Sequence, residues 1–204
     1  MFYYLLKFIL GPISKLIWVK RIDGLINIPK SGPVIIAANH QSYFDFLLLV
    51  AVCPRRIYFL AGEVFFKKWW WRPLVKWTGQ IRVNRDQKDK SASVNKAIDV
   101  LKNEQVLGIF PEGTRSKDGQ LQKAYGGVVK LALKANAPII PVGISGTYQI
   151  MSRHMNSPKF FKIASFKFGE PIVLKESGSN DVDRLRLDII ANERVMSRIK
   201  EMLD

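Results

Sequence analysis

His40 and Asp45 are the residues whose types and spacing best suit a chemical reaction. They lie in the stretch PVIIAANHQSYFD, which begins at Pro33 and places polar residues between two apolar runs. The first run is typical of a buried strand and the second of a helix, so we expect His40 in the turn between them. A neutral imidazole can remove a proton from a hydroxyl, and a carboxylate on its other ring nitrogen fixes the tautomer and stabilises the imidazolium. The pair therefore predicts a general base and the group that orients it.

A serine nucleophile is not indicated. The sequence has no Gly-x-Ser-x-Gly elbow, and the segment from Gly143 to Gly146 lacks its spacing. The pattern favours direct attack by a substrate hydroxyl that His40 has deprotonated. A histidine followed by a helix-start aspartate also arises by chance, as a capped turn without a catalytic role. The interpretation of His40 therefore depends on the rest of the chain.

The composition is that of a folded, strongly basic chain. With 204 residues, 48% of them hydrophobic, the chain can bury the core of one ordinary domain. The 32 lysines and arginines outnumber 17 acidic residues and give a net charge of +15. Such a charge suits a polyanionic partner: nucleic acid, anionic lipid or an acidic carrier protein. A single cysteine, Cys53, and two histidines predict neither a disulfide framework nor a zinc-type cluster.

Apolar runs that suit strands alternate with helical patterns along the chain. We expect strands at 34–38, 57–61, 79–85, 106–110, 138–144 and 163–168, and helices at 46–53, 91–104, 126–136 and 182–203. This alternation predicts a single α/β domain with a mainly parallel central sheet flanked by helices.

The first 24 residues form an apolar segment interrupted by Lys7, Gly11-Pro12 and Lys15. The run before Gly11 is too short to cross a bilayer, and no small-residue cleavage site follows it. We expect two short helices in the membrane interface, with the lysines reaching the headgroups. The predicted organisation is an interfacial segment at 1–24 and a domain at 25–204. A helix packed on the core is the alternative for this segment.

Residues 65–77 hold four of the five tryptophans, interleaved with lysine and arginine. Tryptophan with cationic residues is typical of a membrane interface. A surface that stacks single-stranded nucleic acid and an amphipathic core helix are the other interpretations. Because the sequence shows no recognition helix, zinc finger or RNP-type pattern, we predict a membrane partner and no nucleic acid.

A second chemically suggestive loop, FPEGTRS, runs from Phe110 to Ser116. It directly follows an expected strand, as Arg85 does at the end of another. An arginine binds phosphate through a bidentate fork, and a glycine such as Gly113 lets main-chain amides approach an anion. Parallel strands would bring Arg85 and Arg115 to the same sheet edge as His40.

The sequence resembles the glycerolipid acyltransferases, specifically the 1-acylglycerol-3-phosphate (lysophosphatidic acid) acyltransferases. Residues 39–45 match the NHx4D block of that family, and residues 110–116 match its third block almost letter for letter. Residues 79–85 and 139–143 resemble the second and fourth blocks more loosely. The four blocks together span about half of the chain, in the family's order.

The resemblance implies transfer of a fatty acyl chain to the free hydroxyl of 1-acylglycerol-3-phosphate, which forms phosphatidic acid in phospholipid biosynthesis. His40 would deprotonate the hydroxyl and Asp45 would orient His40. Acyl-CoA or acyl-carrier protein would be the thioester co-substrate, and neither a resident cofactor nor a metal is implied. We expect amides at the start of the helix after His40 to stabilise the charge that develops on the thioester oxygen.

The resemblance also assigns residues to the acceptor. Arg85 and Arg115 would hold its phosphate, while Glu112, Gly113 and Thr114 would shape the glycerol and phosphate site. The implied partners are an anionic phospholipid membrane, a lysophospholipid and the acyl donor. The implied location is the cytoplasmic face of the (inner) cell membrane, as a peripheral or monotopic protein.

Three alternatives stay open from the sequence. The acceptor could be another lysophospholipid or a lyso-ornithine lipid. The protein could move chains between phospholipids as a transacylase without a thioester. A protein of a different class, a non-catalytic lipid-binding protein of the membrane surface, would share the basic and aromatic composition.

Overall fold

The computed structural model describes residues 2–67, 69, 75, 78–83, 91–175 and 181–203. Within them, a seven-stranded sheet has the order β1-β7-β6-β2-β5-β3-β4. The strands are β1 (Val19–Asp23), β2 (Val34–Ala38), β3 (Ile57–Gly62), β4 (Ile81–Val83), β5 (Val106–Ile109), β6 (Ile139–Ser145) and β7 (Ala164–Phe168). Only the β6–β7 pair is antiparallel among these strands, so the predicted mainly parallel α/β sheet is confirmed.

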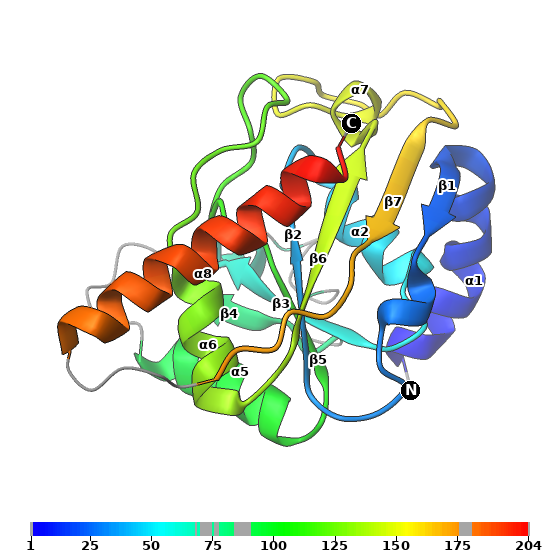
Figure 1. The fold of residues 1–204 in the computed structure, drawn as a ribbon. Coiled ribbons are helices and arrows are strands. Elements are labelled where there is room, and N and C mark those ends of the chain that lie inside the picture. The colour runs from blue at the N-terminus through cyan, green and yellow to red at the C-terminus, as the bar shows by residue number, and fades with distance from the viewer. Residues whose placement is uncertain are drawn as a thin grey trace.

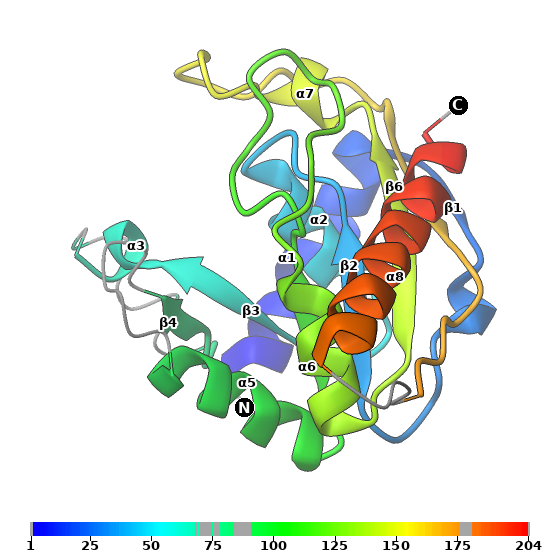
Figure 2. The ribbon, with the colours of Figure 1, turned by 60° about the vertical axis from the view of Figure 1, so that its left-hand side comes forward.

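Helices cover both faces of the sheet (Figures 1 and 2). They are α1 (Phe2–Trp18), α2 (Phe44–Val52), α3 (Glu63–Lys67), α5 (Ser91–Lys102), α6 (Gly127–Ala135), α7 (Thr147–Ile150) and α8 (Asp181–Glu201), with a short 3-10 turn at Leu25–Asn27. Helix α2 packs on one face, with α1 against it, and α5, α6 and α8 pack on the other. This is the arrangement that parallel strands joined by helices require.

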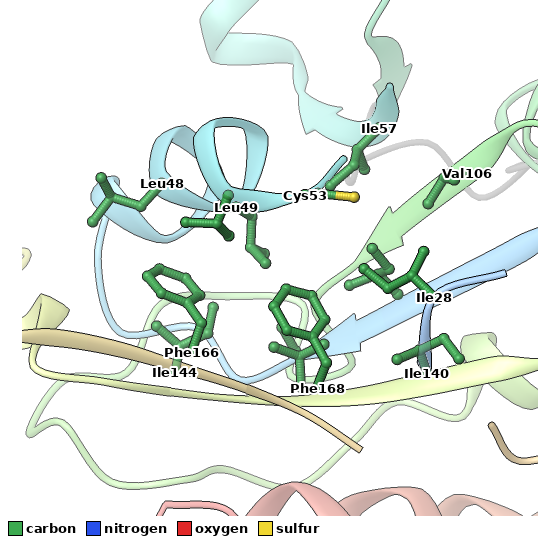
Figure 3. Packing of buried hydrophobic residues seen from close by; sticks show 14 of the residues in the cluster. Ile28, Leu48, Leu49, Cys53, Ile57, Val106, Ile140, Ile144, Phe166 and Phe168 are labelled. Carbon is green, nitrogen blue, oxygen red and sulfur yellow. The ribbon is translucent and has the colours of Figure 1, made fainter. Parts of the chain in front are cut away.

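The central strand β2 is buried on both faces. Val34, Ile36 and Ala38 join the cluster under α2, which Figure 3 shows, and Ile35 and Ala37 join the cluster under α5, α6 and α8. An uninterrupted apolar run is what a strand covered on both sides needs, whereas a half-exposed strand would alternate. This burial fixes the position of β2, and with it the turn that carries His40.

Helix α1 differs from the predicted pair of short helices. It continues through Gly11-Pro12 and packs along α2, with Gly11 buried close to the Ala51 backbone. The Lys7 ammonium turns inward and donates to the backbone carbonyl of Cys53 rather than reaching outward. An isolated peptide of this sequence would break at the internal proline, whereas packing against α2 keeps α1 continuous.

One further feature was not expected from the sequence. Strand β1 lies inside the predicted N-terminal segment and pairs in parallel with β7, so the sheet begins before residue 25. Most of the tryptophan-rich stretch at 65–77 lies outside the described residues, although Trp69 is exposed and Val75 is buried.

Candidate active site

His40 lies immediately beyond the carboxyl end of β2, the edge where open α/β sheets form their ligand crevices. Its Nδ1 lies 2.8 Å from Asp45 Oδ2. The Asp45 side chain is fully buried and that of His40 is 15% exposed. The structure therefore brings together the two residues that the sequence paired, with a fully buried carboxylate against an imidazole of which a small part is exposed.

The Asp45 carboxylate is held by the turn that precedes α2. Its Oδ2 also accepts hydrogen bonds from the amides of Gln41, at 2.6 Å, and Ser42, at 2.7 Å. Asp45 lies in the first turn of α2, where the helix dipole favours a negative charge. These contacts leave the carboxylate one orientation, and it holds the His40 ring in turn.

The same contacts occupy three of the main-chain amides near the start of α2, where we expected donors to the thioester oxygen. The amides of Gln41 and Ser42 bind Asp45, and the amide of Phe44 donates to Ser42 Oγ at 3.0 Å. A buried carboxylate and a helix start both require such donors, so these amides are not available to a substrate oxygen. The sequence could not show that the orienting carboxylate would use them.

The His40 ring is fixed on its face as well as at its edge. It stacks on Phe110, with ring centroids 4.0 Å apart and an interplanar angle of 12°, and Phe110 in turn stacks on Phe59 at 5.7 Å. Asp45 engages Nδ1, which leaves Nε2 as the nitrogen that can accept a substrate proton.

Asn39 joins the His40 turn to β6. Its amide group exchanges two hydrogen bonds with the backbone of Ile144: Nδ2 donates to the carbonyl at 2.9 Å, and Oδ1 accepts from the N–H at 2.7 Å. The side chain thus continues the β2–β6 ladder for one step while the main chain of β2 turns away. Sequence reasoning did not give Asn39 this role, because its partner lies 105 residues further along the chain.

Asn39→Ala is expected to lower the free energy of unfolding by about 2–4 kcal/mol, because it leaves a buried N–H and a buried carbonyl of Ile144 unpaired. Chemical denaturation measures the change. Asn103→Ala, which removes an exposed hydrogen bond to the Asp99 carbonyl, is the control and should cost less than about 1 kcal/mol. Equal effects of the two substitutions would contradict the role given to Asn39.

Glu112 connects the FPEGTRS loop to the His40 turn. It is 1% exposed, and its Oε1 accepts from the His40 amide at 2.7 Å while Oε2 accepts from the Gln122 amide at 3.0 Å. The Ser116 amide donates to the His40 carbonyl at 2.7 Å, so both backbone groups of His40 are bound to this loop. Glu112 therefore shapes the site indirectly, because its carboxylate fixes the main chain at His40 and Gln122.

Burial raises the pKa of Glu112 from 4.5 to about 7, although the two amides oppose the shift. Because the pKa is higher in the folded state, Glu112 contributes stability that is complete below about pH 4.5 and is lost as the pH rises through about 7. Glu112→Gln should remove this dependence. Between these pH values the free energy of unfolding of the wild type should fall by about 2–3 kcal/mol relative to the variant.

Denaturation of both proteins at several pH values checks this expectation. Exposed Glu170 gives the control Glu170→Gln, which should follow the wild type. If the free energy of unfolding changed with pH in the same way in the wild type and in Glu112→Gln, the role given to Glu112 would be contradicted.

A cavity of about 520 Å³ opens beside His40, and the other residues that line it are mostly apolar or aromatic. They are Tyr43, Phe46, Phe59, Leu60, Ala61, Gly62, Val75, Gln80, Val83, Ile109, Phe110, Gly113, Thr114 and Tyr125. Gly113 has a φ of +64°, and a Cβ there would lie 3.2 Å from the Tyr125 ring, so a glycine lets the loop and this ring share the wall. Gly113 and Thr114 thus lie where the sequence placed them, beside the base. Tyr125 was not predicted, and its place depends on the fold of the 110–126 connection.

Arg115 lies close to the His40 turn. The centre of its guanidinium lies 3.5 Å from the centre of the Tyr43 ring, and its Nη1 is buried without a hydrogen-bond partner among the described residues. Burial lowers the pKa of Arg115. A half-buried guanidinium with an unpartnered N–H is suited to an anionic ligand. Arg85, the other predicted phosphate ligand, lies outside the described residues.

A family model described as "Acyltransferase" matches residues 20–145, which include His40, Asp45 and the FPEGTRS loop. The chain belongs to the acyltransferase family. This membership agrees with the resemblance seen in the sequence blocks, and the matched residues contain all four of them.

The chain is similar to named members of this family. A 1-acyl-sn-glycerol-3-phosphate acyltransferase of Bacillus subtilis is 29% identical over 150 residues, which are 72% of this chain and 70% of that protein. A chloroplastic protein of the same name from Brassica napus is 29% identical over 136 residues. The chain spans only 38% of the Brassica napus protein and 37% of an Arabidopsis thaliana relative.

The fold is also similar to a solved one. The crystal structure of the 1-acyl-sn-glycerophosphate (LPA) acyltransferase from Thermotoga maritima aligns with a TM-score of 0.71 at 26% sequence identity. The alignment covers 93% of this chain and 76% of that one. The likeness therefore extends well beyond the matched family segment, to nearly the whole chain.

Proposed function

We propose that this acyltransferase transfers a fatty acyl chain from acyl-CoA or acyl-carrier protein to the free hydroxyl of 1-acylglycerol-3-phosphate and forms phosphatidic acid. The observation that carries the proposal is the 2.8 Å contact between His40 Nδ1 and the buried Asp45 carboxylate, at the wall of an apolar cavity. The names of the similar acyltransferases support the choice of acceptor.

The proposed reaction is a single displacement. His40 Nε2 accepts the proton of the acceptor hydroxyl as its oxygen attacks the thioester carbonyl, and Asp45 stabilises the imidazolium that forms. The carbon–sulfur bond then breaks, and the imidazolium returns the proton to the leaving thiolate. No acyl-enzyme forms, and His40 ends in its starting state.

The cavity suits an acyl chain. Phe46, Phe59 and Leu60 give it apolar walls, while the Arg115 guanidinium stacks on Tyr43, another wall residue, and would bind the phosphate of the acceptor. The glycerol hydroxyl would then lie between an apolar and a cationic region, beside His40. The resemblance implied that Glu112, Gly113 and Thr114 shape the glycerol and phosphate site; Gly113 and Thr114 would do so from the cavity wall, and Glu112 by holding the His40 main chain.

We also propose that α1 holds the protein at the cytoplasmic face of the (inner) cell membrane, as a peripheral or monotopic protein bound to anionic lipid. Phe8 and Leu16 of α1 are 81% and 71% exposed, and Tyr4, Leu5, Ile9, Leu10 and Ile13 are also exposed. Lys15 is exposed on the same helix. An apolar helix face beside cationic residues is typical of interfacial binding. No helix in the described part of the chain has the length and hydropathy to span a bilayer.

Phe8→Glu and Leu16→Glu should each weaken binding to anionic liposomes by about tenfold or more, because each removes an apolar side chain and adds a negative charge. Co-sedimentation with phosphatidylglycerol-containing vesicles measures the loss. Ile190→Glu is the matched control, since Ile190 is an apolar residue of α8 that is 60% exposed. Equal losses in all three variants would show that α1 has no special role.

A product assay tests the proposed reaction. Purified protein in anionic liposomes receives lysophosphatidic acid with acyl-CoA or acyl-carrier protein, and mass spectrometry identifies the product. Phosphatidic acid with at least one donor is the expected result. Product with other lyso-lipids, but none with lysophosphatidic acid, would overturn the acceptor, and product without any thioester would indicate a transacylase.

A further inference from the structure

The loop after α7 lies against the His40 turn. The hydroxyl of Ser42 donates to the Met151 carbonyl at 2.6 Å, and Ser152 is buried, with its Oγ accepting from the His154 amide at 3.3 Å. Figures 1 and 2 show α7 and the 110–126 connection at the same end of the sheet. Arg153 is exposed and lies between the buried Ser152 and His154, so its backbone is held beside this turn.

Arg153 is also an electrostatic neighbour of Arg115. Arg115 stacks on Tyr43, the residue that follows Ser42, and Ser42 holds the Arg153 loop. The positive charge of Arg153 adds to burial in lowering the pKa of Arg115. The loops that carry Arg115 and Arg153, 38 residues apart in the chain, thus meet at the His40 turn, since the Ser116 amide binds the His40 carbonyl and Ser42 binds the Met151 carbonyl.

Neither arginine has a carboxylate partner among the described residues, where no ion pair of Arg115 or Arg153 is formed. The hydrogen bonds of the nearby carboxylates go to other groups: Asp45 Oδ2 binds His40 and two amides, and Glu112 binds two amides, although the Asp45 charge also acts on Arg115. The buried Nη1 of Arg115 still lacks a hydrogen-bond partner among the described residues, and an anion held between the two guanidinium groups would supply one. The pair therefore marks a place for an anion with more than one charge.

We propose that Arg153 is a specificity-determining residue, which joins Arg115 in binding the phosphate of the acceptor and selects a phosphomonoester dianion over a phosphodiester. This inference rests on the proposed function. It adds to that function a residue outside the four sequence blocks and a reason for the choice of acceptor. A monoester offers two negative charges and three free oxygens to two guanidinium forks, whereas a diester offers one charge and two free oxygens.

Steady-state kinetics of Arg153→Ala test the role of Arg153. The KM for lysophosphatidic acid should rise about tenfold with kcat nearly unchanged, because the substitution removes one charge-assisted contact to the phosphate. Arg153→Lys should keep part of the affinity. The KM for lysophosphatidylglycerol, a phosphodiester, should change little, so the preference for the monoester should fall.

Exposed Lys162, between α7 and β7, gives the matched control Lys162→Ala, which removes one positive charge and should leave both KM values unchanged. An unchanged KM for lysophosphatidic acid in Arg153→Ala would overturn the proposal, as would equal rises for both acceptors. A rise confined to the KM for acyl-CoA would assign the site to a donor phosphate and overturn the acceptor assignment.

A binding experiment separates this proposal from the proposed reaction. Calorimetric titration with glycerol 3-phosphate should show binding to the wild type and to Lys162→Ala, and about tenfold weaker binding to Arg153→Ala. That pattern would support the phosphate site even if no acyl transfer were found. Binding of equal strength to all three proteins, or to none of them, would overturn it.

Discussion

His40→Ala is expected to lower kcat for acyl transfer by about 10²–10⁴-fold, because it removes the group that takes the proton of the acceptor hydroxyl in the proposed reaction. The KM values should change much less, since the cavity walls and Arg115 remain. Initial rates of thiol release with lysophosphatidic acid in liposomes measure the change.

The chain provides a matched control for this substitution. His154 is the second of its two histidines and is exposed, so His154→Ala should keep wild-type activity. His40→Ala should still bind liposomes and keep its melting temperature within a few degrees. Wild-type kcat in a folded His40→Ala protein would exclude His40 as the base.

Asp45→Asn is expected to lower kcat by about 10²–10³-fold. Asp45 Oδ2 accepts from His40 and from two backbone amides, and an asparagine amide group can neither stabilise the imidazolium nor keep the ring tautomer in the same way. The substitution should also destabilise the fold by about 1–3 kcal/mol, because an N–H would face buried N–H groups. Kinetics and denaturation measure the two effects.

The control for Asp45→Asn is Asp99→Asn, which changes an exposed carboxylate on α5. It should affect neither kcat nor stability by a comparable amount. If Asp45→Asn lowered stability but left kcat of the folded protein unchanged, Asp45 would be a structural residue only and would not orient His40 for catalysis.

The parts of the site that the sequence predicted are local ones. The buried strand, the turn and the helix start between Val34 and Asp45 follow one another in the chain, so an apolar run and a helix-start aspartate are enough to place His40 and its partner. The loop from Phe110 to Ser116 follows β5 in the same way. Parallel strands then bring both loops to one edge of the sheet.

The parts that the sequence could not predict depend on contacts between distant segments. Asn39 pairs with Ile144 across 105 residues, and Glu112 reaches the His40 amide across 72. Local patterns in the sequence, such as periodicity and residue spacing, do not predict contacts between segments so far apart. The sequence also cannot tell whether a glutamate in a loop binds a substrate or holds the structure. The burial of Glu112 and its bonds to two amides show that it holds main chain.

The N-terminal segment shows the same limit. Gly11-Pro12 predicted a break, because glycine and proline disfavour an isolated helix. In the structure α1 is continuous, since it packs along α2 and this packing stabilises the helix. The predicted outward role for Lys7 also fails, because its ammonium binds a backbone carbonyl at the end of α2.

The most direct test of direct, base-assisted transfer is a stoichiometry measurement on the wild-type protein. Acyl-CoA or acyl-carrier protein is added in anionic liposomes with and without lysophosphatidic acid, while free thiol, phosphatidic acid and the intact protein mass are followed. We expect thiol release only with the acceptor, one thiol per phosphatidic acid, and no acylated protein. An acyl adduct that forms without acceptor would contradict the one-step reaction, and no turnover with any lyso-lipid while liposome binding persists would leave a non-catalytic lipid-binding protein.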